Sequence, residues 1–501
     1  MTANYVIAID QGTTGTTILL VDKEGQIKHH YYQAFPQHYP EPGWVEHDPE
    51  LIWATVRTGL RELFDKAGLA PAAVAAIGLT NQRETIVVWD RATGQPVYPA
   101  IVWQCRRTAA LCRHLEREGY AAMVGAKTGL RLDPYFSATK LQWLLTTFPE
   151  LKQRAARGEL ACGTIDSWLI WKLTGGQVHA TDVTNASRTM LFNIHTLQWD
   201  EELLRLFDIP AAILPAVQPS DGCFGATMPA CTGGVALPIT GVLGDQQAAL
   251  FGQGCLEPGM VKNTYGTGCF LLMNTGTQAC QPRNGMLATV AWGLRNQVTY
   301  ALEGSVFNGG TVIQWLRDEL GILPQAADSE VLAQTVPDTQ GVYFVPAFTG
   351  SGAPHWDPFA RGAILGLTRG TTRAHLARAA LEGIAYQVME VIDCMSQTIG
   401  HRPAGLRVDG GAAANNFLLQ FQADICDVTL QRNRSLELTG TGAAFMAGLG
   451  ANFWQDPAEL AGLVSLEAVF TPRFDPVLRE KLIQGWSKAV ERSGSWVEIE
   501  E

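Results

Sequence analysis

Two glycine- and threonine-rich turns in this sequence, residues 10–14 and 265–268, could bind an anion. Short apolar runs flank each turn and predict two β-hairpins, with strands at 5–9 and 18–21, and at 260–264 and 269–273. Backbone N–H groups in a tight glycine turn converge on an anion, and threonine hydroxyls add donors. The sequence therefore predicts two sites of the size of a phosphate group.

Asp10 opens the first turn. A carboxylate repels a phosphate unless a divalent cation lies between them, and Mg²⁺ favours oxygen ligands and gives up its water reluctantly. We therefore predict that Asp10 faces the Mg²⁺ of a Mg²⁺–nucleotide, through water. The alternative is an ordinary tight turn in which the Asp10 carboxylate accepts from its own backbone. The matched second turn favours the nucleotide.

A third glycine-rich element, residues 406–412, supports a nucleotide site. An apolar run there leads to Asp-Gly-Gly and a predicted helix that begins near Asn415 and Asn416. Because glycine has no Cβ, a flat adenine could lie against this backbone. Other phosphate-binding motifs do not fit: the sequence holds no Gly-Lys for a GxxxxGK[ST] loop, and its nearest GxGxxG, at 440–445, lacks the last glycine.

The strands and helices around these turns indicate an α/β protein with two similar halves. The matched hairpins suggest an internal duplication, which predicts two similar domains, residues 1–252 and 253–501, joined near a hinge at 252–259. A length of 501 residues also allows three domains of about 150 residues each. Apolar residues at every fourth position predict one long helix between residues 372 and 395: Leu376, Ala380, Ile384, Val388 and Ile392.

Composition excludes several classes of protein. With 48 acidic against 37 basic side chains the net charge is −11, so we expect no nucleic-acid partner. Hydrophobic residues make up 47% of the chain, which excludes disorder. No run of 18 apolar residues occurs, so no membrane span is expected. The start of the chain shows no secretion signal, and its ten cysteines form no CxxC pair; we predict buried thiols and a cytoplasmic location. The acidic end, residues 497–501, is predicted to fray.

Several stretches resemble the FGGY family of carbohydrate kinases. Residues 135–144 (YFSATKLQWL) are similar to the first family signature, and residues 362–367 (GAILGL), with 375–376 and 381–382 downstream, are similar to the second. Five further stretches resemble the members that phosphorylate glycerol: 43–48, 81–85, 103–107, 185–190 and 244–248. The resemblance covers essentially the whole chain.

This resemblance implies an α/β fold of the actin/hexokinase/Hsp70 superfamily, with two ribonuclease H-like domains and an interdomain cleft. It implies that the N-terminal domain binds the polyol and the C-terminal domain binds ATP. The implied reaction is the Mg²⁺- and ATP-dependent phosphorylation of glycerol to sn-glycerol 3-phosphate, the first step of glycerol catabolism. We also expect a homo-oligomer, either a dimer or a tetramer.

The resemblance also assigns site residues. Glycerol contacts are expected from Arg83, Glu84, Trp103, Tyr135, Asp245, Gln246 and Phe270. ATP contacts are expected from Thr13, Thr14, Thr267, Gly310, Gln314, Gly411 and Asn415, and metal contacts from Asp10 and Asp245. Trp103 and Phe270 could instead be ordinary core aromatics.

Asp245 is the expected catalytic residue. A primary hydroxyl is a poor nucleophile near pH 7, so a positioned carboxylate must accept its proton as the P–O bond forms. The alternative role of Asp245 is a helix N-cap, because it follows the apolar stretch 239–243. Its neighbour Gln246 and the resemblance favour the base, and one carboxylate could do both.

Two features set conditions on this interpretation. Arg83 offers donors and Glu84 an acceptor, but adjacent residues on a strand face opposite sides, so both reach one ligand only at a strand end or turn. Thr17 stands where the family usually carries a basic residue aimed at the phosphates. Phosphate neutralisation must then rest on Mg²⁺, backbone N–H groups or another cation.

Two other functions stay open from the sequence. One is a related kinase for another polyol or a ketose. The other, from a different class, is an actin-fold, nucleotide-dependent assembly or chaperone-like protein. Residues 81–85 and 103–107 argue against the second, because a protein that only hydrolyses ATP needs no polyol pocket.

Overall fold

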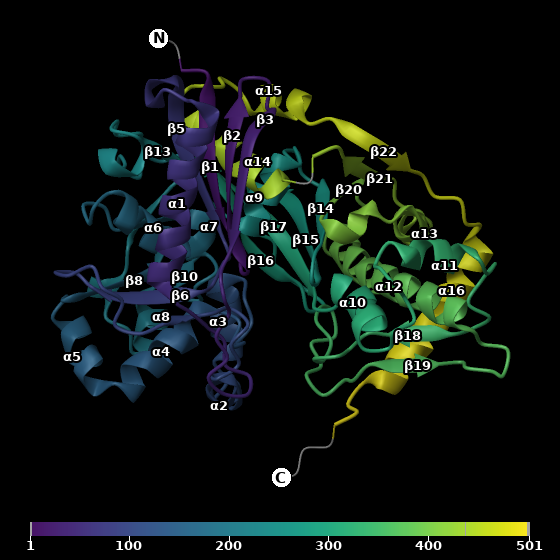
Figure 1. The fold of residues 1–501 in the computed structure, drawn as a ribbon. Helices are drawn as coiled ribbons and strands as arrows, with labels where there is room; N and C mark the ends of the chain where they lie inside the picture. The colour runs from purple at the N-terminus through teal and green to yellow at the C-terminus, as the bar shows by residue number, and fades with distance from the viewer. Residues whose placement is uncertain (1–2, 436, 498–501) are drawn as a thin grey trace.

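The structure is a computed structural model that describes residues 3–435 and 437–497 and shows two α/β parts side by side (Figure 1). The N-terminal part contains a five-stranded sheet with the order β13-β5-β1-β2-β3. Its strands are β1 (Tyr5–Gln11), β2 (Gly15–Asp22), β3 (Ile27–Ala34), β5 (Val74–Asn81) and β13 (Ile239–Gly244). The first three are antiparallel, whereas β5 and β13 run parallel to β1.

The C-terminal part contains a seven-stranded sheet with the order β16-β17-β15-β14-β20-β21-β22. Its strands are β14 (Val261–Tyr265), β15 (Cys269–Gly276), β16 (Leu287–Leu294), β17 (Gln297–Val306), β20 (Leu406–Asp409), β21 (Leu430–Asn433) and β22 (Leu466–Phe470). Here too an antiparallel hairpin, β14–β15, is followed by parallel strands, β20 and β21. Both predicted hairpins are therefore confirmed, and each begins the same strand pattern.

Alternating residues of β1 pack on two faces, as the period of a strand requires. Ile7 and Ile9 pack with helices α1 (Pro49–Ala67) and α6 (Ile165–Leu173) on one face. Val6 and Ala8 pack with α9 (Asp245–Gly252) and α14 (Leu438–Gly450) on the other. Helix α14 comes from the C-terminal half of the chain and packs on the N-terminal sheet. The predicted domain boundary between residues 252 and 253 stays a prediction, and these contacts join the two sides of it.

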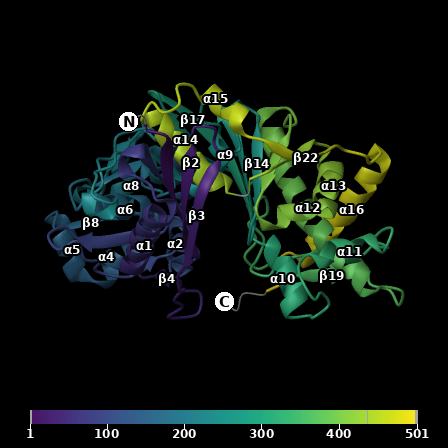
Figure 2. The ribbon, with the colours of Figure 1, turned by 45° about the horizontal axis from the view of Figure 1, so that its top comes forward.

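Helices α9 and α14 also contact each other closely where the two parts meet (Figure 2). A Cβ on Gly442 would lie 1.9 Å from the carbonyl oxygen of Ala248, so only glycine allows this approach. The incomplete GxGxxG at 440–445 therefore serves helix packing, which agrees with the sequence-based rejection of that motif.

The predicted long helix is α12 (Arg373–Ile399), which runs four residues beyond the expected end. Thr372 and His375 form a capping box at its start, and Gly400, with a φ of 84°, ends it in the left-handed conformation. Ala380, Ile384, Val388 and Ile392 are buried as predicted, whereas Leu376 is only partly buried. The helix packs beside β15 and β17 of the second sheet.

The remaining elements surround these sheets. In the N-terminal part they are β4 (Glu46–His47), β6 (Ile86–Asp90), β7 (Ala100–Ile101), β8 (Leu160–Thr164), α2 (Ala109–Arg117), α3 (Ala121–Thr128), α4 (Ser137–Thr147), α5 (Pro149–Ala156), β9 (Ala180–Asp182), α7 (Val183–Ala186), β10 (Phe192–Asn193), β11 (Gln198–Trp199), α8 (Glu201–Leu206) and β12 (Ala216–Gln218). In the C-terminal part they are α10 (Gly310–Asp318), α11 (Asp328–Gln334), β18 (Tyr343–Val345), β19 (Ala363–Leu365), α13 (Asn416–Cys426), α15 (Pro457–Leu463) and α16 (Pro476–Ser493).

Some expectations about composition need correction or stay open. The prediction that the cysteines are buried is wrong for Cys223, which is exposed, and for Cys280, which is half-buried. Both lie in segments that connect helices and strands. Within the described residues, no helix is long and apolar enough to cross a membrane. Apart from Val497, the acidic end predicted to fray lies outside the described residues.

Candidate active site

The first turn lies between β1 and β2 and is held by neighbouring side chains. Its backbone closes with a hydrogen bond from Gly12 N–H to the carbonyl of Gly15, at 2.9 Å. The Gln37 amide donates to the Thr13 carbonyl at 2.8 Å, and the Trp103 indole N–H donates to the Thr13 hydroxyl at 2.9 Å. Because that hydroxyl accepts from Trp103, its own hydrogen remains free for a ligand.

The second turn lies beside the other residues expected to bind nucleotide. The N–H of Gly310, at the start of α10, donates to the Gly266 carbonyl at 2.8 Å. Gly410 has a φ of 89°, and a Cβ there would lie 2.5 Å from the Tyr265 carbonyl oxygen. Glycine is therefore required where the Asp-Gly-Gly turn passes the end of β14. The structure thus brings Thr267, Gly310 and Gly411 into one region.

Gln314 and Asn415 belong to the same region of the C-terminal part. Gln314 follows Gly310 by one turn of α10 and is exposed. Asn415 caps α13, since its Oδ1 accepts from Leu418 N–H at 2.9 Å, and its Nδ2 donates to the Ser329 hydroxyl at 3.3 Å. Thr13 and Thr14 lie in the turn between β1 and β2 of the N-terminal part, so the expected ATP contacts come from both parts.

Arg83 and Glu84 lie in the loop between β5 and β6, which meets the geometric condition set by their adjacency. Glu84 has a φ of 61°, a left-handed conformation that is uncommon for a residue with a side chain. Both side chains are buried. Strain of this kind persists where surrounding contacts fix it, and it is concentrated at functional sites.

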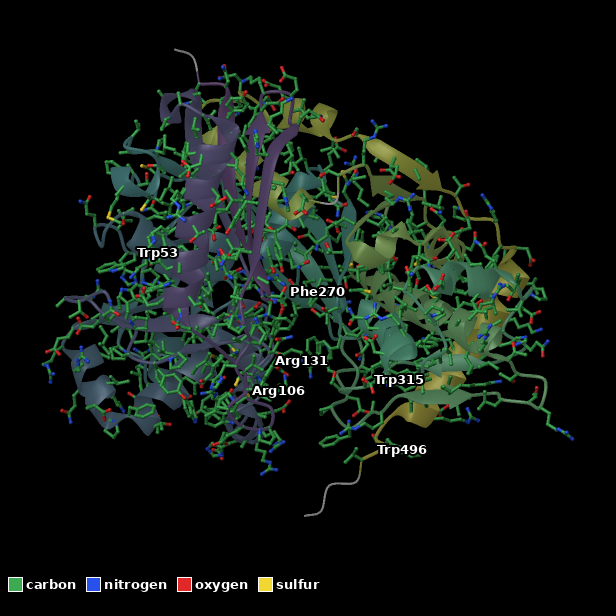
Figure 3. All side chains as sticks on the ribbon, in the orientation of Figure 1. Trp53, Arg106, Arg131, Phe270, Trp315 and Trp496 are labelled. Atoms are coloured by element: carbon green, nitrogen blue, oxygen red, sulfur yellow. The ribbon has the colours of Figure 1, made fainter. Side chains whose placement is uncertain are left out.

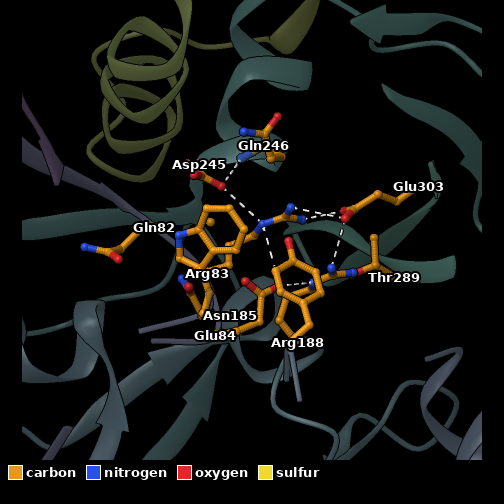
Figure 4. Close-up of polar contacts among 12 residues, drawn as sticks. Gln82, Arg83, Glu84, Asn185, Arg188, Asp245, Gln246, Thr289 and Glu303 are labelled. Carbon is orange, nitrogen blue, oxygen red and sulfur yellow. Dashed lines mark hydrogen bonds and ion pairs between the residues drawn. The ribbon is translucent and has the colours of Figure 1, made fainter. Parts of the chain in front are cut away.

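Those contacts form a buried network of charges (Figure 4). Arg83 donates to Glu303 through Nη1 at 2.5 Å and Nη2 at 3.2 Å. Arg188 donates to Glu303 at 2.9 Å and to Glu84 at 2.7 Å. Burial disfavours the ionised form of Glu303, but the guanidinium groups of Arg188 and Arg83 outweigh it and lower the pKa of Glu303 to about 2. Glu303 therefore holds both arginines in place.

Asp245 is the first residue of α9 and lies next to this network (Figure 4). Its Oδ1 is 3.1 Å from Arg83 Nε and accepts from Gln246 N–H at 2.7 Å. The side chain is 26% exposed, so it is accessible to a substrate. Burial raises the pKa of Asp245, and Arg83 and Lys262 partly offset this rise. A carboxylate with a raised pKa at a helix start is suited to accept a proton near neutral pH.

Three aromatic side chains cluster beside the charge network, where the Arg188 guanidinium lies 5.7 Å from the centre of the Tyr135 ring. The ring of Trp103 lies 5.6 Å from that of Tyr135 and 6.3 Å from that of Phe270, both edge-on. Trp103 and Tyr135 come from the N-terminal part, whereas Phe270 comes from β15 and lies between the two parts (Figure 3). This aromatic cluster is therefore completed only by both parts together.

Asp10 lies on β1 directly opposite Thr17 on β2. Burial, together with the negative charges of Asp245 and Glu437, raises the pKa of Asp10 to about 8. Like charges this close disfavour ionisation unless a cation lies among them. Within the described residues, no group of three or more His, Cys, Asp or Glu side chains is arranged to hold a metal ion.

Sequence reasoning missed two residues that organise this site, Glu303 and Lys262. Each is a fully buried charge within a strand, β17 and β14 respectively. For Glu303 the available signal was a single charged residue directly after the apolar run Tyr300–Leu302, because a buried charge is costly without a partner. The strand of Lys262, VKNTY, is largely polar and carries no such signal. Arg188 lay within the recognised stretch 185–190 but was not assigned a role.

The chain is similar in sequence and in fold to known carbohydrate kinases over nearly its whole length. The N-terminal and C-terminal domain models of the FGGY family of carbohydrate kinases match residues 5–252 and 261–451. A glycerol kinase of Carboxydothermus hydrogenoformans is 55% identical over 501 residues, 100% of both chains, and one of Symbiobacterium thermophilum is 55% identical over 99% of each. The crystal structure of Plasmodium falciparum glycerol kinase with ADP covers 99% of each chain at 36% identity, with a TM-score of 0.93. Gluconate kinase from Lactobacillus acidophilus has a TM-score of 0.88 at 25% identity, covering 97% of this chain and 98% of its own.

Proposed function

The chain belongs to the FGGY family of carbohydrate kinases, and we propose that its site transfers the γ-phosphoryl group of ATP to glycerol. The product is sn-glycerol 3-phosphate, and the reaction is the first step of glycerol catabolism. The observation that carries this proposal is the accessible Asp245 carboxylate, whose Oδ1 lies 3.1 Å from Arg83 Nε and accepts from the Gln246 N–H. The full-length similarity to glycerol kinases supports glycerol as the substrate.

Glycerol binds through hydrogen bonds to its hydroxyls and apolar contact with its carbon chain. Glu84 accepts from a hydroxyl, since a carboxylate can accept more bonds than the one from Arg188. Arg83 contributes the Nη2 hydrogen that its contact with Glu303 leaves free. Trp103 and Phe270 cover the carbon chain. Tyr135 completes this set against Trp103.

Asp245 then accepts the proton of the terminal hydroxyl as its oxygen attacks the γ-phosphorus and the bond to the β-phosphate oxygen breaks. Arg83 keeps the carboxylate ionised and oriented. Water must be excluded, because it would otherwise compete with glycerol for the phosphoryl group. We infer that the two parts close over the substrates about the segment 252–259.

The nucleotide lies across the two turns, with its phosphates at Thr13, Thr14 and Thr267 and its adenosine against Gly310, Gln314, Gly411 and Asn415. Asp10 would hold a Mg²⁺ ion beside the phosphates. Burial and the negative charges of Asp245 and Glu437 raise its pKa, and a cation there would favour its ionised form. Asp245 lies near enough to add its negative charge. When bound, the ion neutralises charge on the phosphates. We also propose that the protein is located in the cytoplasm and forms a homodimer or homotetramer.

A substrate panel tests this function directly. ADP release should be measured with Mg²⁺-ATP and glycerol, dihydroxyacetone, xylulose or gluconate. We expect glycerol to give the highest kcat/KM. A higher value for xylulose or gluconate would keep the family and refute the substrate. ADP release that no acceptor stimulates would instead indicate the non-kinase alternative.

Replacing Asp10 by asparagine should change the dependence on metal. The amide keeps the shape of the side chain but removes the negative charge that faces the cation. We expect Asp10→Asn to need several-fold more Mg²⁺ for half-maximal activity and for thermal stabilisation by ADP. Titrating Mg²⁺ against both readouts checks this, and unchanged midpoints would remove Asp10 from the metal site.

Replacing Thr17 by arginine should improve the use of ATP. Thr17 is half-buried and lies opposite Asp10, so a guanidinium there would face the phosphates and the charge that spreads over the transferring group. We expect a several-fold lower KM for ATP or a higher kcat, with the KM for glycerol nearly unchanged. If Thr17 only packs at its strand, arginine would lower the melting temperature and leave the ATP kinetics as they were.

A further inference from the structure

Lys262 is a buried lysine next to the proposed glycerol site. It lies in β14, directly before the second turn, and its exposed fraction is 0%. Burial lowers the pKa of Lys262 to about 8, so most molecules still carry the ammonium at pH 7. The charge is balanced by carboxylates on three neighbouring elements: Asp245 on α9, Glu303 on β17 and Asp409 on β20, with Arg83 as the opposing cation. A lysine so deeply buried is costly unless it makes specific contacts.

Both hydrogen bonds of this ammonium go to neutral oxygens. Nζ donates to Gln246 Oε1 and, at 3.1 Å, to the Thr264 hydroxyl. Gln246 follows Asp245 on α9 and is half-buried (Figure 4). The contact therefore joins the hairpin of the C-terminal part to the helix that carries the proposed base.

The bond to Lys262 fixes which way the Gln246 amide faces. An ammonium has three donors and no acceptor, so only the oxygen of the amide can pair with it. The NH₂ group of Gln246 must then point away from Lys262, with both hydrogens available as donors. Without the ammonium, the amide could rotate and present its oxygen instead.

We propose that Lys262 is a positioning residue for the acceptor substrate: by holding Oε1, it presents the Gln246 NH₂ group to a hydroxyl oxygen of glycerol. This inference rests on the proposed function, because it needs glycerol to bind beside Gln246. Lys262 thus acts in substrate recognition through Gln246 and does not contact the reacting atoms. Nucleotide binding at Thr13 and Gly411 does not depend on it.

Lys262→Met and Lys262→Arg test the proposal together. Methionine fills similar space without charge, and we expect it to raise the KM for glycerol roughly 10- to 100-fold, the range for leaving a buried polar group without its hydrogen-bond partner. The KM for ATP should stay within about threefold. Arginine keeps the charge and donors, and it should recover much of the loss. If methionine prevents folding, Lys262→Gln takes its place.

A double-mutant cycle decides whether Lys262 acts through Gln246. In a Gln246→Ala background, Lys262→Met should change the KM for glycerol by less than about threefold, because the group it positions is gone. An equal effect in both backgrounds would overturn the proposal. So would a lower melting temperature with an unchanged KM for glycerol, which a merely structural role predicts. Wild-type protein without glycerol turnover would refute the proposed function itself, and that is measured first.

Discussion

Asp245→Asn is expected to lower kcat by about 10²- to 10⁴-fold, the usual contribution of a general base. The amide is isosteric with the carboxylate and can still accept from Gln246 N–H, so the start of α9 should persist. It cannot accept the proton of the attacking hydroxyl. The KM values for glycerol and ATP should change much less than kcat. Steady-state kinetics and a thermal melt on the purified variant measure both effects.

An aspartate at the start of another helix, α16, provides a matched control for the Asp245→Asn substitution. Asp475 is the N-cap residue of α16. Its side chain accepts hydrogen bonds from the Val477 and Leu478 N–H groups, and it lies outside the proposed site. Asp475→Asn should leave kcat unchanged and cost at most about 1 kcal/mol of stability. If Asp245→Asn lost less than tenfold in kcat at an unchanged melting temperature, Asp245 would not be the base.

Local features of the site could be predicted from the sequence. Each hairpin turn is short, so the order of apolar runs, glycines and threonines specifies it without distant residues. The same holds for the Asp-Gly-Gly turn after β20 and for the start of α12 at Thr372. These elements determine where phosphates and adenine can lie, which is why the nucleotide interpretation did not depend on the resemblance alone.

The charge network could not be predicted in this way, because its partners are far apart in the chain. Arg83 is hydrogen-bonded to Glu303, which lies 220 residues further along the chain, and Arg188 is hydrogen-bonded to Glu303 over a separation of 115 residues. No periodicity relates such residues; the packing of the two sheets through α9 and α14 brings them together. The resemblance supplied Arg83 and Glu84, but only the loop conformation explains how neighbours face one site.

Glu303→Gln should have the second large effect, this time on stability. Removing one partner of a buried ion pair costs about 3–5 kcal/mol, and here two guanidinium groups, of Arg83 and Arg188, lose their counter-charge. A fall in the pKa of Glu303 from its ordinary value of 4.5 to about 2 corresponds to about 3 kcal/mol in favour of the folded state. We expect a melting temperature roughly 3–5 °C lower at pH 7, because the unfolding entropy of 501 residues is about 1 kcal/mol/K. The KM for glycerol should also rise, because Glu303 orients Arg83.

The pH dependence distinguishes this charge effect from a packing defect. The folded-state pKa of Glu303 lies below its unfolded value, so its contribution is complete above about pH 4.5 and is lost as the pH falls toward 2. The difference in melting temperature between wild type and Glu303→Gln should therefore be constant above about pH 5. It should narrow below that pH, because Glu303 takes up a proton in the unfolded state while it stays ionised in the folded protein until about pH 2. Glu159→Gln, which removes an exposed partner of Arg157, should leave the melting temperature nearly unchanged, because solvent screens this pair. A wild-type–variant difference independent of pH would mean that Glu303 stabilises the site by shape and not by charge.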